Sequence, residues 1–198
     1  MDKPWVKSYP EGVPAEIDAS AYRSVSDLLE DSFRKNRDRR AFVCMGKAIT
    51  YGELDEMSRR LAAWFQLKGL QRGARVALMM PNVLQYPVAI AAVLRAGYIV
   101  VNVNPLYTPR ELEHQIKDSG AEAIVILENF AHTLQAVVRN TAIKHVVVAA
   151  MGDLMGLRAD RESRRAAREE DGARMEPAGQ HALQRCTGRR RASHAREG

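Results

Sequence analysis

The sequence predicts an α/β fold with a doubly wound, mainly parallel sheet, followed by a disordered C-terminal tail. Between residues 75 and 149, four nearly continuous apolar runs alternate with helical stretches, which is typical of sheets whose strands are buried on both faces. The composition then changes near Gly156-Leu157. We therefore divide the chain into residues 1–157, which form a domain, and residues 158–198, which form the tail.

Two local patterns come first along the chain. The stretch from Ser24 to Asn36 has the spacing of an amphipathic surface helix. Its apolar residues fall on one face: Val25, Leu28, Leu29 and Phe33. Residues 41–44 and 47–51 are short extended runs on either side of Met45-Gly46, which indicates a β-hairpin.

A longer helix is expected after the hairpin. Thr50 and Glu53 have the spacing of a capping box, in which each side chain accepts a hydrogen bond from a backbone N–H that would otherwise be unpaired. The helix ends at Gly69. Its core-facing residues are expected to be Leu54, Met57, Leu61, Trp64 and Phe65.

The regular part of the domain begins at Arg75. The expected strands are Arg75–Met79, Tyr98–Asn102, Glu122–Leu127 and Lys144–Ala149. The expected helices between them are Val83–Ala96, Pro109–Asp118 and Phe130–Arg139. This repeated order implies right-handed crossovers with helices on both faces of the sheet. Thr108, Pro109 and Glu111 mark one helix start as N-cap, first helical residue and capping-box partner.

One stretch, Val83 to Val103, is apolar enough and long enough to be tested as a membrane-spanning helix. Pro87, Arg95 and Gly97 interrupt it, and an arginine at a helix centre costs about 2.5 to 3.5 kcal/mol on insertion scales. We therefore expect a helix, a turn and a strand here, and no transmembrane segment.

The tail differs from the domain in composition. Residues 158–198 contain 11 Arg, no Lys and 7 acidic residues, and their only large aliphatic residues are Met175 and Leu183. Such a stretch cannot bury enough surface to offset its ordering entropy, so we expect disorder. Arginine clusters could bind anionic polymers, but interleaved acids and the lack of aromatic residues argue against nucleic acid as a partner.

Cysteine usage and the N-terminus indicate a cytoplasmic protein. Cys44 and Cys186 lie on opposite sides of the composition change, with no Cys-x-x-Cys motif, which suits a reducing compartment. The first residues, Met1 to Trp5, lack the apolar core of a signal peptide.

The domain carries no motif of a catalytic centre. No Gly-x-Gly-x-x-Gly or Gly-x4-Gly-Lys-Ser/Thr loop follows any strand, and no Gly-x-Ser-x-Gly or His-Glu-x-x-His motif is present. After the first parallel strand, Pro81 removes a backbone donor where a phosphate loop would need one. We assign no catalytic, cofactor-binding or metal-binding residue.

Polar residues after the second parallel strand are the remaining candidates: Asn102, Asn104, Tyr107 and Thr108. Ligands favour the carboxyl ends of parallel strands, but the preferred interpretation is that the two asparagines and Pro105 shape the turn while Thr108 caps the next helix. The histidines His114, His132 and His145 have no converging partners in the sequence and are interpreted as solvated side chains.

Several motifs together resemble the N-terminal region of adenylate-forming acyl-CoA synthetases, and within them bacterial long-chain fatty acid–CoA ligases. The resemblance runs from Trp5 to Leu157. It is carried by Ile49-Thr-Tyr-Gly-Glu-Leu54, Gly73-Ala-Arg-Val-Ala-Leu78, Leu94-Arg-Ala-Gly97 and Asn102-Val-Asn-Pro-Leu-Tyr-Thr-Pro-Arg-Glu-Leu112.

The resemblance implies that ATP and a fatty acid form an acyl-adenylate, from which coenzyme A displaces AMP, with Mg²⁺ as the metal. It also implies peripheral association with the inner membrane. The family's phosphate loop, adenine-binding segment and catalytic lysine have no counterpart in residues 158–198. Residues 1–157 are then part of an AMP-binding domain that is inactive alone, and the tail is a continuation in an unrelated reading frame.

Two alternatives stay open at this point. The chain could be a non-catalytic binding module with a basic, anion-binding tail. It could also belong to a synthetase for an aryl or medium-chain acid, because the resemblance places most acid-pocket residues outside this chain.

Overall fold

The computed structural model describes residues 3–18 and 20–155, and its sheet has the predicted α/β architecture. Four parallel strands, β3 (Arg75–Met79), β4 (Ile99–Asn102), β5 (Ala123–Leu127) and β6 (His145–Ala149), lie in the order β4-β3-β5-β6. All four predicted strands are confirmed, with ends that differ by at most one residue. The predicted tail, residues 158–198, lies outside the described residues.

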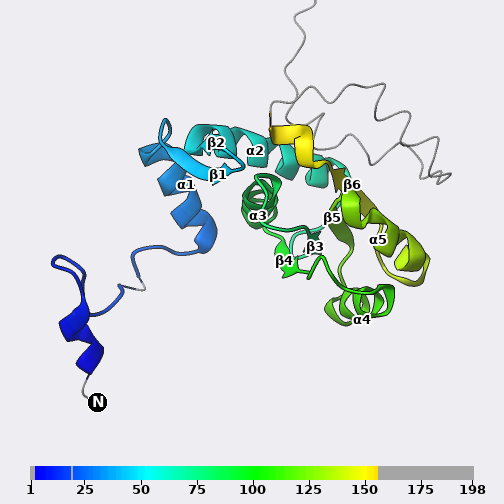
Figure 1. Cartoon of the computed structure of the whole chain (residues 1–198), viewed down its shortest axis with the longest axis horizontal. Helices are drawn as coiled ribbons and strands as arrows, with labels where there is room; N and C mark the ends of the chain where they lie inside the picture. The colour runs from blue at the N-terminus through cyan, green and yellow to red at the C-terminus, as the bar shows by residue number, and fades with distance from the viewer. Residues whose placement is uncertain (1–2, 19, 156–198) are drawn as a thin grey trace, which may run out of the picture.

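Helices cover both faces of this sheet, as Figure 1 shows. Helices α2 (Tyr51–Leu67) and α3 (Gln85–Arg95) share one apolar cluster with inward residues of β3 and β5, such as Leu78 and Val125. Helices α4 (Pro109–Ser119) and α5 (Ala131–Val137) pack on the other face, against Met79 and Ile126. Successive strand residues point to opposite faces, so each strand needs apolar residues throughout. The doubly wound prediction is confirmed.

Both predicted capping boxes are present. Thr50 Oγ1 accepts a hydrogen bond from the Glu53 N–H, and the Thr50 N–H donates to the Glu53 carboxylate at 2.8 Å. Thr108 and Glu111 make the same reciprocal pair at the start of α4. Helix α4 then ends at Gly120, whose φ of 65° is left-handed, a conformation that glycine adopts without a steric penalty.

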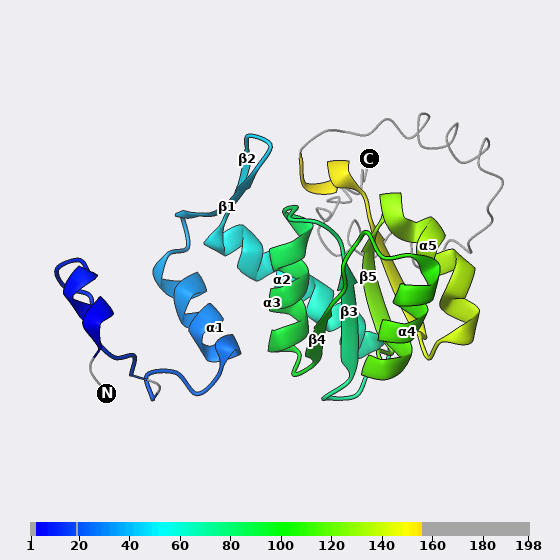
Figure 2. The same cartoon turned by 60° about the horizontal axis from the view of Figure 1, so that its bottom comes forward.

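The predicted hairpin consists of β1 (Arg40–Cys44) and β2 (Lys47–Thr50), which pair antiparallel. Met45 and Gly46 connect the strands with φ values of 49° and 76°. Two consecutive left-handed residues form the tight turn whose twist matches that of the flanking strands. Figure 2 shows the hairpin projecting from the rest of the molecule.

Helix α1 (Val25–Lys35) forms where it was predicted, but its apolar face is only partly covered. Phe33 is buried and Leu29 is half-buried, whereas Val25 and Leu28 are exposed in the part of the chain that the structure describes. The reason is its position, because α1 contacts α2 and α3 along one side and lies between the N-terminal segment and the rest of the molecule in Figure 2.

The apolar stretch from Val83 to Val103 forms a helix, a turn and a strand, as predicted. Helix α3 ends at Arg95, Gly97 has a φ of 78°, and β4 follows. Within residues 3–18 and 20–155, no helix has the length and apolar character needed to cross a membrane.

Strand β6 is an edge of the sheet among the described residues, and this leads to a first prediction. Its unpaired backbone groups and apolar side chains form a template on which another chain can add a strand. We expect the 198-residue chain to associate at high concentration, so the apparent molar mass from light scattering should rise with concentration. A monodisperse sample that melts cooperatively would contradict this expectation.

Candidate functional site at the carboxyl edge of the sheet

The topology of the sheet indicates where a ligand would bind, which is at the carboxyl ends of the strands. Strand β3 leads to α3 on one face, while its neighbour β5 leads to α5 on the other face. Ligands of open α/β sheets bind at such a switch, outside the carboxyl ends of the strands. The candidate residues therefore follow Met79, Asn102, Leu127 and Ala149.

The polar residues after β4 serve the local structure. The Asn104 side chain accepts a hydrogen bond from the Leu106 N–H at 3.0 Å, which forms the turn, and Thr108 caps α4. Tyr107 is half-buried against the apolar cluster beneath α4. For Asn104 and Thr108 the preferred interpretation from the sequence is confirmed.

Asn102 has a partner that the sequence did not indicate. Its side-chain oxygen accepts a hydrogen bond of 2.8 Å from the Tyr86 hydroxyl, and its backbone oxygen accepts one of 2.9 Å from the Gln115 amide. Burial raises the pKa of the Tyr86 hydroxyl, which keeps it a proton donor. These two hydrogen bonds join α3 and α4 to the end of β4. Asn102 takes part in both of them, so it has a structural role at the carboxyl edge.

Gln85 is a second residue that sequence reasoning missed. It is almost fully buried in the first turn of α3, and its amide nitrogen donates to the Ala150 backbone oxygen at 2.7 Å. Ala150 directly follows β6, so this hydrogen bond joins the start of α3 to the segment after β6. No local pattern could reveal it, because the partners are 65 residues apart.

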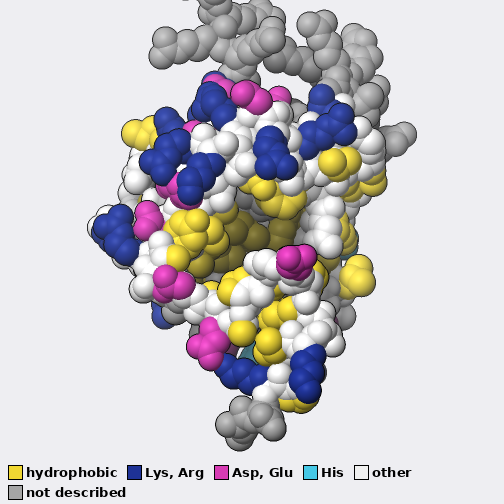
Figure 3. Space-filling view, turned by 90° about the vertical axis from the view of Figure 1, so that its left-hand side faces the viewer, with side chains coloured by type: hydrophobic (Ala, Val, Ile, Leu, Met, Phe, Trp, Pro, Cys, Tyr) yellow, Lys and Arg dark blue, Asp and Glu magenta, His cyan; other side chains and the backbone are white. Residues whose placement is uncertain are grey.

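An apolar groove of about 310 Å³ lies beside this edge, between the hairpin and α3. This volume is at the lower end of the range for small-molecule pockets. The Tyr86 and Asn82 residues at the carboxyl edge also line it. Its apolar walls come from Leu29, Phe42, Val43, Cys44, Leu84, Pro87 and Ile90, among others. Figure 3 shows hydrophobic side chains gathered in a hollow at this end of the molecule.

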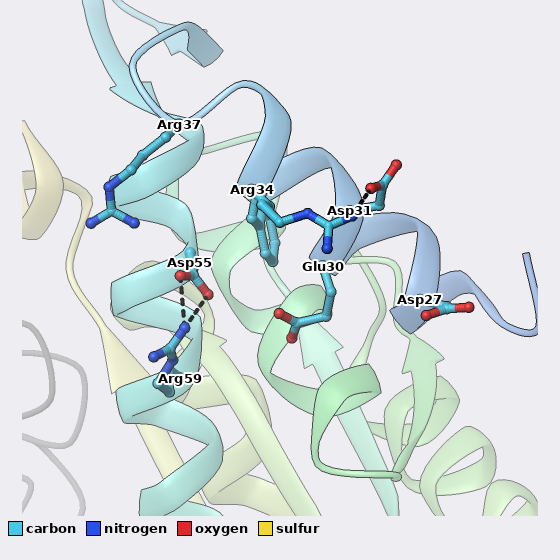
Figure 4. A pocket seen from close by; sticks show the side chains of 8 residues that line it. Asp27, Glu30, Asp31, Arg34, Arg37, Asp55 and Arg59 are labelled. Carbon is cyan, nitrogen blue, oxygen red and sulfur yellow. Dashed lines mark hydrogen bonds and ion pairs between the residues drawn. The ribbon is translucent and has the colours of Figure 1, made fainter.

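A second hollow, shown in Figure 4, is lined by charged side chains of α1 and α2. Asp55 is its best-connected residue and accepts two hydrogen bonds from Arg59, at 3.0 and 2.8 Å, and one from Arg95 at 2.9 Å. Burial raises the Asp55 pKa, but the hydrogen bonds from Arg95 and Arg59 outweigh burial and hold the pKa below its usual value. Apart from Arg37, the charged residues that line this hollow are therefore paired within the described part of the chain.

Arg95 is the residue that joins three helices around this hollow. Its guanidinium donates to the Asp55 backbone oxygen and to the Ser58 hydroxyl, each at 2.8 Å, and also pairs with Glu30 of α1. The group lies 5.5 Å from the centre of the Phe33 ring. Arg95 therefore has a structural role in this fold.

The three histidines of the described residues, which lie on α4, α5 and β6, belong to no cluster of metal-binding side chains there. His114 and His132 are exposed, as predicted. The prediction for His145 was wrong, because its ring is half-buried and meets Trp64 edge-on, with ring centres 6.5 Å apart. Burial, together with the charges of Lys68 and Lys144, lowers the His145 pKa. Its packing partner lies on α2, far from it in sequence, so the pattern could not reveal the contact.

The implied ATP and Mg²⁺ can be tested against the donors of the described residues. No group of three or more His, Cys, Asp or Glu side chains in residues 3–18 and 20–155 could hold a metal ion. The β3 turn contains Pro81, which lacks the N–H that a phosphate group would need. A magnesium–nucleotide complex would find no such ligand cluster among these residues and one backbone donor fewer at the turn after β3.

A four-stranded parallel sheet with helices on both faces, whose carboxyl edge is held by a Tyr–Asn–Gln cluster, defines a doubly wound α/β protein. The model of the AMP-binding enzyme family matches residues 29–186, which is most of the chain. The chain belongs to this family. The match includes part of the segment assigned above to the tail.

Three relatives illustrate the likeness. Long-chain-fatty-acid–CoA ligases of Yersinia pestis and Escherichia coli are each 58% identical over 154 residues, or 77% of this chain, but only 27% and 28% of their own lengths are covered. A crystal structure of a long-chain-fatty-acid–CoA ligase from Archaeoglobus fulgidus has a TM-score of 0.60 at 25% identity, covering 67% of this chain and 29% of that one. The recognition made from the sequence motifs is confirmed, and the chain spans just over a quarter of the relatives' length.

Proposed function

We propose that this chain is part of an enzyme that joins a long-chain fatty acid to coenzyme A at the expense of ATP, through an acyl-adenylate. The observation that carries the proposal is the 58% identity, over 154 residues, to two proteins named for this ligation. The same observation favours a long-chain acid over an aryl or medium-chain acid. Magnesium is the metal that we expect the complete enzyme to use.

We further propose that this polypeptide alone does not form an adenylate. Positioned donors that stabilise the charge on the transferring group commonly contribute more to catalysis than any other single effect. The domain carries no phosphate-loop motif, and Arg59 and Arg95, which could supply donors, are engaged in ion pairs with Asp55. ATP, Mg²⁺ and coenzyme A are therefore expected to bind poorly to this chain by itself.

An isotope-exchange assay tests the second proposal. With oleate and ATP, the 198-residue chain should exchange pyrophosphate into ATP no faster than a blank without protein. The Escherichia coli relative serves as the positive control, and circular dichroism should verify that the chain is folded. Exchange clearly above the blank would overturn the proposal.

A chimera tests the first proposal. Residues 5–155 of this chain would replace the aligned segment of the Yersinia pestis relative. Because the identity is high, we expect the chimera to keep forming oleoyl-CoA at a rate within about tenfold of that relative, which is a barrier change of about 1.4 kcal/mol. A chimera that is folded and inactive, while the parent is active, would contradict the proposal that this chain is part of such a ligase.

For the location, we propose a cytoplasmic protein that associates peripherally with the inner membrane. The observations that support it are the cysteine pattern and a water-exposed surface that carries both cations and apolar side chains. We also retain residues 158–198 as a separate tail on the basis of composition.

A further inference from the structure

Ala150, the residue that follows β6, is held at both of its backbone groups. Its N–H donates a hydrogen bond of 2.8 Å to the Asp153 carboxylate, and its oxygen accepts one of 3.1 Å from the Asp153 N–H. The same oxygen accepts the 2.7 Å bond from the amide nitrogen of Gln85, which also donates to the Met151 oxygen at 3.4 Å. The chain therefore leaves β6 with its backbone groups paired and in one direction.

The bond from Gln85 differs from the two that Asp153 makes. The Asp153 bonds join residues three positions apart, so they shape the turn itself. Gln85 lies in the first turn of α3, so its amide anchors that turn to another helix. Gln85 and Ala150 are only 1% and 6% exposed, and a buried carbonyl keeps a protein partner where water has little access.

The segment after Ala150 packs on the apolar cluster shared by α2, α3 and one face of the sheet. Its contacts come from Met151, Leu154 and Met155, which lie in and next to the short helix η4 (Met151–Leu154, yellow in Figure 1). Apolar contacts are non-directional, so they keep the segment on this surface without fixing its orientation. The amide of Gln85 supplies a directional contact between the segment and α3.

This exit from β6 lies at the carboxyl edge of the sheet, where ligands of open α/β sheets bind. The relatives extend well beyond the matched part, since only 27% and 28% of their lengths are covered. In the ligase proposed above, the polypeptide continues from Met155, so a shift at the exit would displace the segment that follows. A displacement of about 1 Å caused by a substitution far from the chemistry can lower a rate about 100-fold.

We propose that Gln85 is a positioning residue of the ligase, which fixes the direction in which the chain leaves β6 and so places the segment after Met155 at the carboxyl edge. Gln85 acts through the backbone of Ala150 and Met151. This inference rests on the proposed function and adds to it a residue that sets the geometry of the site.

Hydrogen exchange in the 198-residue chain tests the local part of the proposal. Gln85→Met keeps an unbranched side chain of similar length and removes the amide donor. The N–H groups of Ala150 and Asp153 should exchange at least about tenfold faster in the variant, because the turn opens more often once it loses its anchor. The N–H groups within β5, such as that of Val125, should be unchanged. Equal exchange at Ala150 and Asp153 in the variant and the parent chain would overturn the proposal.

The chimera described above tests the effect on catalysis. Gln85→Met in the chimera should lower kcat for oleoyl-CoA formation by about 10- to 100-fold, with KM values for ATP and oleate within about threefold of the unsubstituted chimera. A purely structural role would lower the folded fraction and leave kcat per folded molecule unchanged. Circular dichroism at the assay temperature measures that fraction.

Gln135→Met is the matched control. Gln135 is exposed on α5, so the same change of side chain should alter neither the exchange of Ala150 and Asp153 nor kcat. Equal losses of kcat for Gln85→Met and Gln135→Met would contradict a specific role for Gln85.

Gln85→Glu adds a pH-dependent rescue and decides the matter if Gln85→Met does not fold. Burial raises the pKa of a carboxyl group at this position, and the Asp153 carboxylate beside Ala150 raises it further. A protonated carboxyl group can donate to the Ala150 oxygen, whereas an ionised one cannot. The kcat of this variant, relative to the unsubstituted chimera, should therefore rise as the pH falls from about 8.5 to about 6. A ratio that stays constant over this range would overturn the proposal.

The two proposals fail in different ways. An unsubstituted chimera that is folded and inactive contradicts the proposed function, and with it the role of Gln85 in the ligase. An active chimera in which Gln85→Met keeps the unsubstituted kcat contradicts the role of Gln85 alone. A rise in KM with kcat unchanged also contradicts that role, because it shows lost substrate binding without misplaced reacting groups.

Discussion

Replacement of Arg95 by alanine should lower the free energy of unfolding by about 3 kcal/mol. The side chains of Arg95 and Asp55 are only 11% and 12% exposed. Arg95 also donates hydrogen bonds to the Ser58 hydroxyl and the Asp55 backbone oxygen. Removal of the guanidinium leaves a largely buried carboxylate with one cationic partner, Arg59, whose own side chain is mostly exposed. Chemical denaturation monitored by circular dichroism would measure the loss.

A matched control lies on the neighbouring helix, α2. Arg60 pairs with Glu56 at the surface, and exposed pairs of this spacing contribute roughly 0.3 to 0.5 kcal/mol. Arg60→Ala should therefore have a small effect. If Arg95→Ala and Arg60→Ala cost the same, Arg95 does not hold the three helices together as described.

The sign of the pH dependence follows from Asp55. Because its pKa is lower in the folded protein than its usual value, the unfolded chain binds a proton at this group first as the pH falls. The stabilisation is present above the ordinary aspartate pKa and is lost as the pH falls through the lowered value. Asp55→Asn should flatten this acid limb of the stability curve.

Phe65→Ala should lower the free energy of unfolding by about 3 to 5 kcal/mol, the range for loss of a buried aromatic side chain. Phe65 is fully buried, and its ring meets Trp64 and Tyr98 edge-on, with ring centres 5.4 and 6.2 Å apart. The alanine leaves a cavity between α2 and the start of β4, because the sheet cannot move to fill it. Denaturant unfolding would measure the change.

Leu67, two residues further along α2, is the control for Phe65. It is 87% exposed, so Leu67→Ala should change the free energy of unfolding by no more than about 0.5 kcal/mol. Similar losses for the two variants would show that α2 does not pack on the sheet through Phe65.

The elements that were predicted well depend on neighbours in sequence. Capping boxes at Thr50 and Thr108 need only residues three positions apart, and the turn at Met45-Gly46 needs only two residues with left-handed backbone. Buried strands of a parallel sheet are apolar throughout, so their sequences identify them. The same local rule explains why the turn-forming role of Asn104 was predicted.

The predictions that failed or were missing depend on distant partners. The contact of His145 with Trp64, the bond of Gln85 to Ala150 and the pairing of Arg95 with Asp55 join residues that only the fold brings together. The incomplete burial of α1 has the same origin, because a helical pattern gives the apolar face and does not give the surface that covers it.

The sequence by itself determined the fold class, the order of helices and strands, and the likeness to long-chain-fatty-acid–CoA ligases. Hydrophobic periodicity, helix capping and sequence motifs all depend on residues that are close together in the chain. Only the tertiary structure decided which polar residues are structural and which cations remain unpaired within the described part of the chain. Arg95 and Arg40 are the same residue type in the sequence. Arg95 is buried beside Asp55 and joins helices within the fold. Arg40 is exposed on the projecting hairpin and has no ion pair among the described residues.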